Sequence, residues 1–223
     1  MNYVMVRRLI LKDWYLQRWI ILGCFAGGVV SLGVIAAGGK SGFFIGLLLL
    51  ITSLIVIGGQ LAASTIIAER KDQTLAFAMS LPISYREYTA SKIVGNLLIF
   101  LVAWIPMLLC SLGLLLYTPK TYGLVPYLAI MATEIFVTTC LTIAVSVITE
   151  SQAWMIAAIM VGNLALNIVG YLVAHIQSIA RGMEGSSIQW TPAASALLFA
   201  EFATIALLIG TTFFVQSRKK DFL

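Results

Sequence analysis

The sequence predicts an all-α polytopic membrane protein: six transmembrane helices, an amphipathic N-terminal helix at the membrane interface, and a short amphipathic helix on the cytoplasmic side. Its 223 residues are 61% hydrophobic and 10% charged, whereas soluble domains average about 45–50% apolar and about 25% charged residues. So few charges cannot cover a water-exposed surface, and the mean hydropathy of +1.00 agrees. These values exclude a soluble enzyme, a disordered chain and a disulfide scaffold.

The first 18 residues predict the interfacial helix. Basic residues (Arg7, Arg18) and apolar or aromatic residues (Leu11, Trp14) recur there at helical spacing. We expect them to form separate basic and apolar faces, as in helices that lie in the plane of the membrane interface. Residues 1–18 would then lie on the inner leaflet.

Six long apolar runs follow. A helix crosses the bilayer core of about 30 Å with about 20 apolar residues, and lipid leaves backbone groups no partner except those of the helix itself. The runs are residues 19–38, 43–68, 93–117, 124–148, 153–176 and 193–215. They take up most of the chain, so we expect residues 1–223 to form a single transmembrane domain.

Between the second and third runs, the loop of residues 69–84 has a distinctive pattern. Glu69 and Arg70 begin a charged cluster, an apolar stripe follows, and Pro82 ends the helical pattern. The stripe consists of Leu75, Phe77, Ala78, Met79 and Leu81. A simple connector needs no such stripe, so these residues predict a short amphipathic helix that lies on lipid or docks on a cytoplasmic partner.

The segment before the last span, residues 177–192, is the longest on its side of the membrane. It mixes Ile179, Ile188 and Trp190 with Arg181. Apolar residues in an outer loop favour partial re-entry into the membrane, so we predict an outer re-entrant segment.

The basic residues predict the orientation. Of the 14 lysines and arginines, only Lys40, Lys120 and Arg181 lie on one side of the spans, and the other eleven lie on the opposite side. Lysine and arginine accumulate in cytoplasmic segments. We therefore expect both termini in the cytoplasm and a multi-pass location in the cytoplasmic membrane.

Residues 38–41 read Gly-Gly-Lys-Ser and resemble the end of a phosphate-binding loop. The full pattern needs a glycine at position 34, where the chain has Val34. The segment also joins two apolar spans, so a tight outer turn is the better interpretation.

Residues with catalytic or metal-binding potential are sparse. The three cysteines lie far apart inside apolar runs, and the single histidine, His175, is at a span end. We expect no catalytic, cofactor or metal site in the chain and no enzyme activity of its own.

Two acidic residues fall within predicted spans. Glu134 and Glu201 would each cost on the order of 3 kcal/mol to insert unless they are paired or face a cavity. They either line a substrate path or proton relay, or form hydrogen bonds between helices. The candidate polar neighbours are Gln60, Asn96, Asn163 and Asn167.

Small residues recur four positions apart, as in Gly23 with Gly27 and Gly42 with Gly46. This spacing permits close approach of membrane helices. It is common in polytopic proteins and does not indicate which helices meet.

The run from Glu69 to Lys92 resembles the loop between the second and third spans of type-2 ABC transporter permeases. It reads E-R-K-x-x-T-L-x-F-x-x-S-L-P-I-S-x-x-E-Y-x-x-S-K. In that family this loop forms a coupling helix that docks on the ATPase subunit, and an N-terminal connecting helix precedes six spans. The resemblance implies a coupling helix at residues 69–84, a connecting helix at residues 1–18 and a fold like that of the ABCG exporters.

By the same resemblance, the chain would be the membrane subunit of an exporter. It would form a homo- or heterodimer with a second permease subunit, surrounded by lipid and without nucleic acid. Two copies of a separate ATPase would bind ATP and Mg²⁺. The implied ATPase-coupling residues are Glu69, Arg70, Leu75, Phe77, Met79, Leu81 and Pro82. The main alternative is a membrane-embedded sensor or immunity protein that binds a cytoplasmic partner without transport, and no side chain identifies a substrate.

Overall fold

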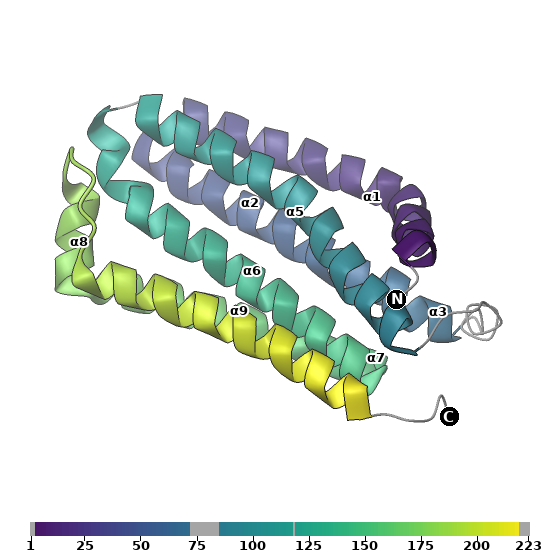
Figure 1. Ribbon diagram of the computed structural model, residues 1–223. Coiled ribbons are helices and arrows are strands. Elements are labelled where there is room, and N and C mark those ends of the chain that lie inside the picture. Colours follow the sequence, from purple (N-terminus) through teal and green to yellow (C-terminus); the bar gives the residue numbers. More distant parts are fainter. Residues whose placement is uncertain (1–2, 72–84, 118, 219–223) are drawn as a thin grey trace.

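The computed structural model describes residues 3–71, 85–117 and 119–218, which form a bundle of long helices (Figure 1). Six of these helices are long and apolar enough to cross a membrane, which confirms the predicted all-α polytopic fold. In chain order the elements are α1 (Tyr3–Ala37), α2 (Gly39–Ala62), the π-helix η1 (Ala63–Ile67), α3 (Ala68–Lys71), α5 (Tyr85–Tyr117), the 3₁₀ helix η2 (Pro119–Leu124), α6 (Val125–Thr149), α7 (Gln152–His175), α8 (Gln177–Glu184) and α9 (Pro192–Arg218).

The helix α6 forms the centre of the bundle. It packs against α2 and α5 on one side and against α7 and α9 on the other, while α1 covers α2 and α5 (Figure 1). Small partners allow the close approach: Gly58 of α2 lies against Thr139, and Gly162 of α7 lies against Thr138. Most of α6 is therefore buried, whereas α1, α7 and α9 expose most of their surface.

The predicted interfacial helix and the first span form one continuous helix, α1. Residues 3–22 contain neither glycine nor proline, so nothing in the sequence interrupts the helix. Figure 1 shows the first turns of α1, in dark purple, bent away from the rest of the helix.

The expected separation of basic and apolar faces on α1 is wrong. Arg7, Leu11, Trp14 and Arg18 are all exposed. At 3.6 residues per turn these positions fall on the same side of a helix. A different face of α1 is buried, and it carries Val6, Leu9, Asp13 and Gln17.

Two helices extend beyond the apolar runs that predicted them. The second span continues through η1 and α3 to Lys71, and α5 begins at Tyr85, well before the predicted boundary at residue 93. Charged residues end an apolar run without ending a helix, because lysine and glutamate are good helix formers. This extension places charged side chains on the helices that precede and follow residues 72–84.

Residues 177–192 contain the short helix α8, at one end of the bundle (Figure 1). Ile179 is buried against Ile130, Val173 and Ala194 at the ends of α6, α7 and α9. Contact with protein therefore explains part of the apolar character of this segment. Re-entry of residues 177–192 into the membrane stays a prediction.

Only one of the two glycine pairs noted in the sequence lies at a close helix contact. A Cβ atom added to Gly46 would lie 2.5 Å from Ile35 Cγ1 and 2.7 Å from the Ser31 carbonyl oxygen, both in α1. A Cβ atom on Gly23 would meet no atom within 4 Å. The contact between α1 and α2 thus depends on the absence of a side chain at position 46.

We expect Gly46→Val to destabilise the protein by about 1–3 kcal/mol, because the new side chain forces α1 away from α2. Unfolding of the purified protein in detergent would measure the effect. Gly23→Val is the matched control and should unfold like the wild type. Equal stability of the two variants would contradict this helix contact.

Candidate functional site

A buried lysine marks the place where three helices meet. Lys92 of α5 is only 1% exposed. Its Nζ atom lies 2.9 Å from Asp13 Oδ2 of α1 and 2.8 Å from Glu69 Oε2 of α3. An ammonium group is costly to bury unless it is paired and hydrogen-bonded, and these two carboxylates provide both.

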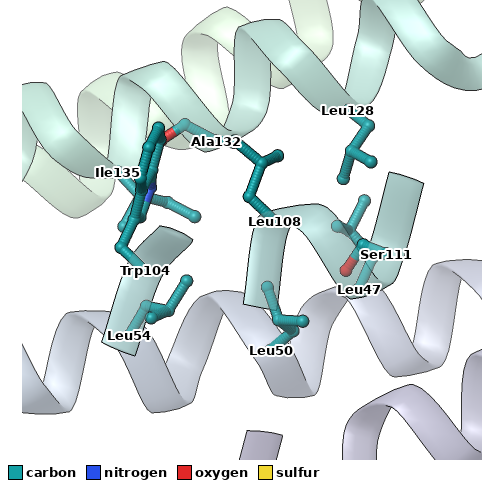
Figure 2. Close-up of a pocket in the computed structure, with 9 residues that line it drawn as sticks. All are labelled: Leu47, Leu50, Leu54, Trp104, Leu108, Ser111, Leu128, Ala132 and Ile135. Atoms are coloured by element: carbon teal, nitrogen blue, oxygen red, sulfur yellow. The ribbon is translucent and has the colours of Figure 1, made fainter. Parts of the chain in front are cut away.

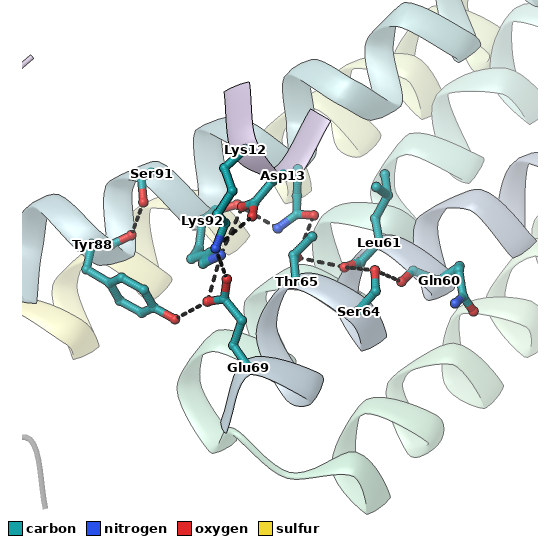
Figure 3. A network of polar contacts seen from close by, with 11 residues as sticks. Lys12, Asp13, Gln60, Leu61, Ser64, Thr65, Glu69, Tyr88, Ser91 and Lys92 are labelled. Atoms are coloured by element: carbon teal, nitrogen blue, oxygen red, sulfur yellow. Dashed lines mark hydrogen bonds and ion pairs between the residues drawn. The ribbon is translucent and has the colours of Figure 1, made fainter. Parts of the chain in front are cut away.

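Two further side chains complete this charge cluster, which consists of Lys12, Asp13, Glu69, Tyr88 and Lys92 (Figure 3). Lys12 forms an ion pair with Glu69 Oε1 and lies 3.5 Å from Asp13 Oδ1. The Tyr88 hydroxyl donates a 2.9 Å hydrogen bond to Glu69 Oε2. Each carboxylate is thus contacted by both lysines.

The lysines determine the charge state of Glu69. Burial by itself raises the pKa of this carboxyl group, but the charges of Lys92 and Lys12 and their hydrogen bonds outweigh burial and lower the pKa below its ordinary value of 4.5. Glu69 is therefore ionised at neutral pH and remains available to both lysines.

A neutral network joins the charge cluster to the π-helix η1. Asn96 Nδ2 donates a 2.7 Å hydrogen bond to the Lys92 carbonyl oxygen. The Thr65 hydroxyl lies 2.9 Å from Asn96 Oδ1 and 2.7 Å from the Leu61 carbonyl oxygen (Figure 3). Single π-helical turns inside α-helices are rare and are often found at functional sites.

The charge cluster lies at both ends of the segment of residues 72–84. Glu69 belongs to α3, which precedes the segment, whereas Tyr88 and Lys92 lie in the first turns of α5, which follows it. Lys12 and Asp13 of α1 pair with Glu69 and Lys92, so the cluster connects α1 to the helices on both sides of the segment.

Sequence reasoning placed Glu69 at a functional position, and the structure brings it into the charge cluster. Arg70 lies in α3, and its side chain is outside the described residues. The other predicted coupling residues lie within residues 72–84, outside the described residues, and their role stays a prediction. They are Leu75, Phe77, Met79, Leu81 and Pro82.

The structure separates the predicted intramembrane polar residues into two groups. Glu134 and Glu201 are buried, at 5% and 6% exposure, on the adjoining helices α6 and α9. Gln60 and Asn167 are exposed on α2 and α7, and Asn163 is half-buried. The five residues therefore do not form one continuous path within this chain.

The exposed group belongs to a longer polar face. Asn163, Asn167, Tyr171 and His175 follow at intervals of four residues along α7, so they share one side of the helix. Gly59 of α2 packs against Ile159, one turn before Asn163, and Gln60 is its neighbour. We call Gln60, Asn163, Asn167, Tyr171 and His175 the α2–α7 polar face.

A small pocket between α2, α5 and α6 is part of the packed core (Figure 2). Its two polar side chains are already bonded: Trp104 Nε1 donates to the Ala132 carbonyl oxygen, and Ser111 Oγ donates to the Met107 carbonyl oxygen. The remaining lining residues are Leu47, Leu50, Leu54, Leu108, Leu128 and Ile135, with Ala132. The pocket therefore offers a ligand no free polar group.

Comparison with known families decides what kind of protein carries these features. A family model described as ABC-2 family transporter protein matches residues 21–204. The chain belongs to this family. The ABC-2 permease is therefore a multi-pass membrane component of an ABC transporter. No curated protein and no solved structure gives a significant match.

Most of the charge cluster of the ABC-2 permease was not recognised from the sequence. Glu69, Tyr88 and Lys92 belong to the family-like run, but no contact between them was predicted. Lys12 counted only as a basic residue that indicates orientation, and Asp13 carried no prediction. The one available signal was the family-like run, which begins at Glu69 and ends at Lys92. Lys12 and Asp13 precede the matched residues, and only the folded chain brings them to Lys92.

Proposed function

We propose that this ABC-2 permease is the membrane subunit of an exporter that is driven by a separate ATPase in the cytoplasm. The working unit contains two permease subunits and two ATPase copies, and the ATPase binds ATP and Mg²⁺. The charge cluster carries this proposal, because it joins three helices at the base of the loop that resembles a coupling helix.

In this proposal the ATPase contacts residues 69–84, and nucleotide-driven closure of the two ATPase copies displaces that segment. Glu69, Tyr88 and Lys92 transmit the displacement to α3 and α5, and Asp13 transmits it to α1. Such a conformational change requires that the ATPase contacts the segment differently in its two states.

The α2–α7 polar face supports transport over the alternative of a sensor. Amide, phenol and imidazole side chains on a membrane-spanning helix are costly against lipid. If these side chains lined a water-filled path between two permease subunits, water would hydrogen-bond to them. A sensor that only binds a cytoplasmic partner has no need of such a face.

The proposed orientation has both termini and residues 69–92 in the cytoplasm. Single cysteines at Lys40 and at Lys71, in a background without native cysteines, would be treated with an impermeant thiol reagent in intact cells. We expect labelling at position 40 in intact cells. At position 71 we expect labelling only after the cells have been opened. The reverse pattern would overturn the orientation, which rests on the bias in lysine and arginine.

Photocrosslinking tests the proposed partner directly. A photoreactive amino acid at position 77 should crosslink the full-length permease to an ATP-binding-cassette ATPase in cells, because the apolar stripe is proposed to insert into the partner. The same amino acid at position 187, in the outer segment, is the matched control and should give no such product. Crosslinks from position 77 to lipid alone would contradict the proposal.

A further inference from the structure

Glu134 and Glu201 are buried acids on two adjoining membrane helices, α6 and α9. Each lies nine residues after the first residue of its helix, Val125 of α6 or Pro192 of α9. The two helices pack together and begin at the same end of the bundle (Figure 1). The two acids thus lie at a similar depth on adjoining helices, and both are buried.

Among the described residues, neither acid forms an ion pair. Both carboxyl oxygens of Glu201 are buried without a hydrogen-bond partner among the described residues. Three of the four amides considered as possible partners donate to backbone carbonyl oxygens: Asn96 to that of Lys92, Asn163 to that of Ile159 and Asn167 to that of Asn163. Within the described part of the chain, none of these three amides bonds to either acid.

The helices around the two acids supply no cation at this depth. Residues 41–62 of α2, 93–117 of α5 and 152–174 of α7 contain no lysine, arginine, aspartate or glutamate. The basic side chains of α8 and α9, Arg181 and Arg218, are exposed at opposite ends of the bundle.

Other titratable groups of the packed helices cannot balance two carboxylates. Tyr127 and Cys140 of α6 lie about two turns to either side of Glu134. On the other helices such groups are exposed or at helix ends: Cys110 and Tyr117 of α5, and Tyr171 and His175 of α7. His175, the last residue of α7, lies at the end of the bundle and not beside the two acids.

Two adjacent carboxylates cannot both stay ionised in such surroundings, because each charge is costly in the membrane and the two repel each other. One bound proton removes a charge and turns one acid into a hydrogen-bond donor for the other, as in paired catalytic carboxyls. We propose that Glu134 and Glu201 form a binding site for a single proton, shared between α6 and α9.

A proton fits the site better than a metal ion does. The described residues contain no cluster of three or more histidine, cysteine, aspartate or glutamate side chains that could hold a metal. A hard cation prefers six or more oxygen ligands, whereas a proton needs only the two carboxyl groups. Loss of the proton restores the repulsion, so contact between α6 and α9 at this depth depends on proton occupancy.

A hydrophobic carbodiimide tests the site, since it reacts with protonated carboxyl groups that are shielded from water. The purified permease in lipid nanodiscs would be treated with dicyclohexylcarbodiimide at pH 7 and analysed by mass spectrometry. We expect one adduct per chain, on Glu134 or Glu201. Glu87 and Glu150 are half-buried at helix ends outside the apolar spans, where water competes for the reagent, so they should react much less than the two acids.

Glutamine variants provide the controls, because glutamine keeps the shape and can donate the hydrogen bond of the protonated acid. Glu134→Gln and Glu201→Gln should each leave one adduct on the remaining acid, and the double variant should show none. Two adducts per chain, or none in the folded wild type, would overturn the shared proton. Protection by sodium ions or by an organic amine would also overturn it, in favour of a cation site.

This inference does not depend on the proposed function, because the labelling requires neither the ATPase nor transport. A permease that binds no ATPase but takes up one carbodiimide would disprove the exporter and leave the proton site intact. Crosslinking to the ATPase without carbodiimide labelling would support the exporter and disprove the proton site.

Discussion

Lys92→Ala is expected to lower the free energy of unfolding by about 3–5 kcal/mol, because it removes the buried cation shared by Asp13 and Glu69. Of the described ion-pair partners, only the exposed Lys12 then remains to balance both carboxylates. Asp13 Oδ2 and Glu69 Oε2 lie 2.9 and 2.8 Å from the ammonium that this change removes. Asp13, at 3% exposure, cannot recover its solvation from water. Unfolding of the purified permease in detergent would give the magnitude.

Lys71→Ala is the matched control, because it removes the same charge from an exposed position in α3. Exposed charges contribute about 0–1 kcal/mol, so this variant should unfold like the wild type. The triple variant Lys92→Met, Asp13→Asn, Glu69→Gln removes the buried charges together and should recover part of the lost stability. Equal stability of Lys92→Ala and Lys71→Ala would show that the charge cluster does not hold the three helices together.

Leu81→Asp and Phe77→Ala are expected to abolish copurification of the ATPase while the permease still inserts into the membrane. Under the proposed function both side chains are buried anchors in a cleft of the partner. Truncating such an anchor costs about 2 kcal/mol or more, which is about 30-fold in affinity. Introducing a carboxylate there is more severe, because the charge would be buried without a partner.

The control is Arg70→Ala, which removes a charge predicted at the rim of the contact, where truncation has little effect on affinity. ATP hydrolysis coupled to the permease should follow the same order, with Leu81→Asp the most impaired and Arg70→Ala close to the wild type. If Leu81→Asp retained both ATPase binding and coupled hydrolysis, residues 69–84 would lie on the lipid surface and would not form a coupling helix.

The sequence by itself determined the six membrane helices and the family. Each span is a local property, because about 20 apolar residues in succession have only one stable form in lipid. The loop pattern from Glu69 to Lys92 is also local, and it agrees with the family match over residues 21–204. Helix ends were less predictable, since a charge at Lys71 or Glu87 ends an apolar run but not the helix.

Only the tertiary structure decided which side chains meet. Gly42 and Gly46 have the same spacing as Gly23 and Gly27, yet only the first pair lies where the backbone of α1 passes close to α2. The reason is that helical periodicity fixes which residues share a face, but it does not fix which neighbouring helix covers that face.

The same limit applies to the buried charges. Asp13 and Lys92 pair across 79 positions, and no local pattern relates them. Glu134 and Glu201 were recognisable as costly residues in the sequence, but three of the four amides considered as their partners donate to backbone carbonyl oxygens. The placement of the two acids at a similar depth follows from the parallel packing of α6 and α9, which arises only when the whole chain is folded.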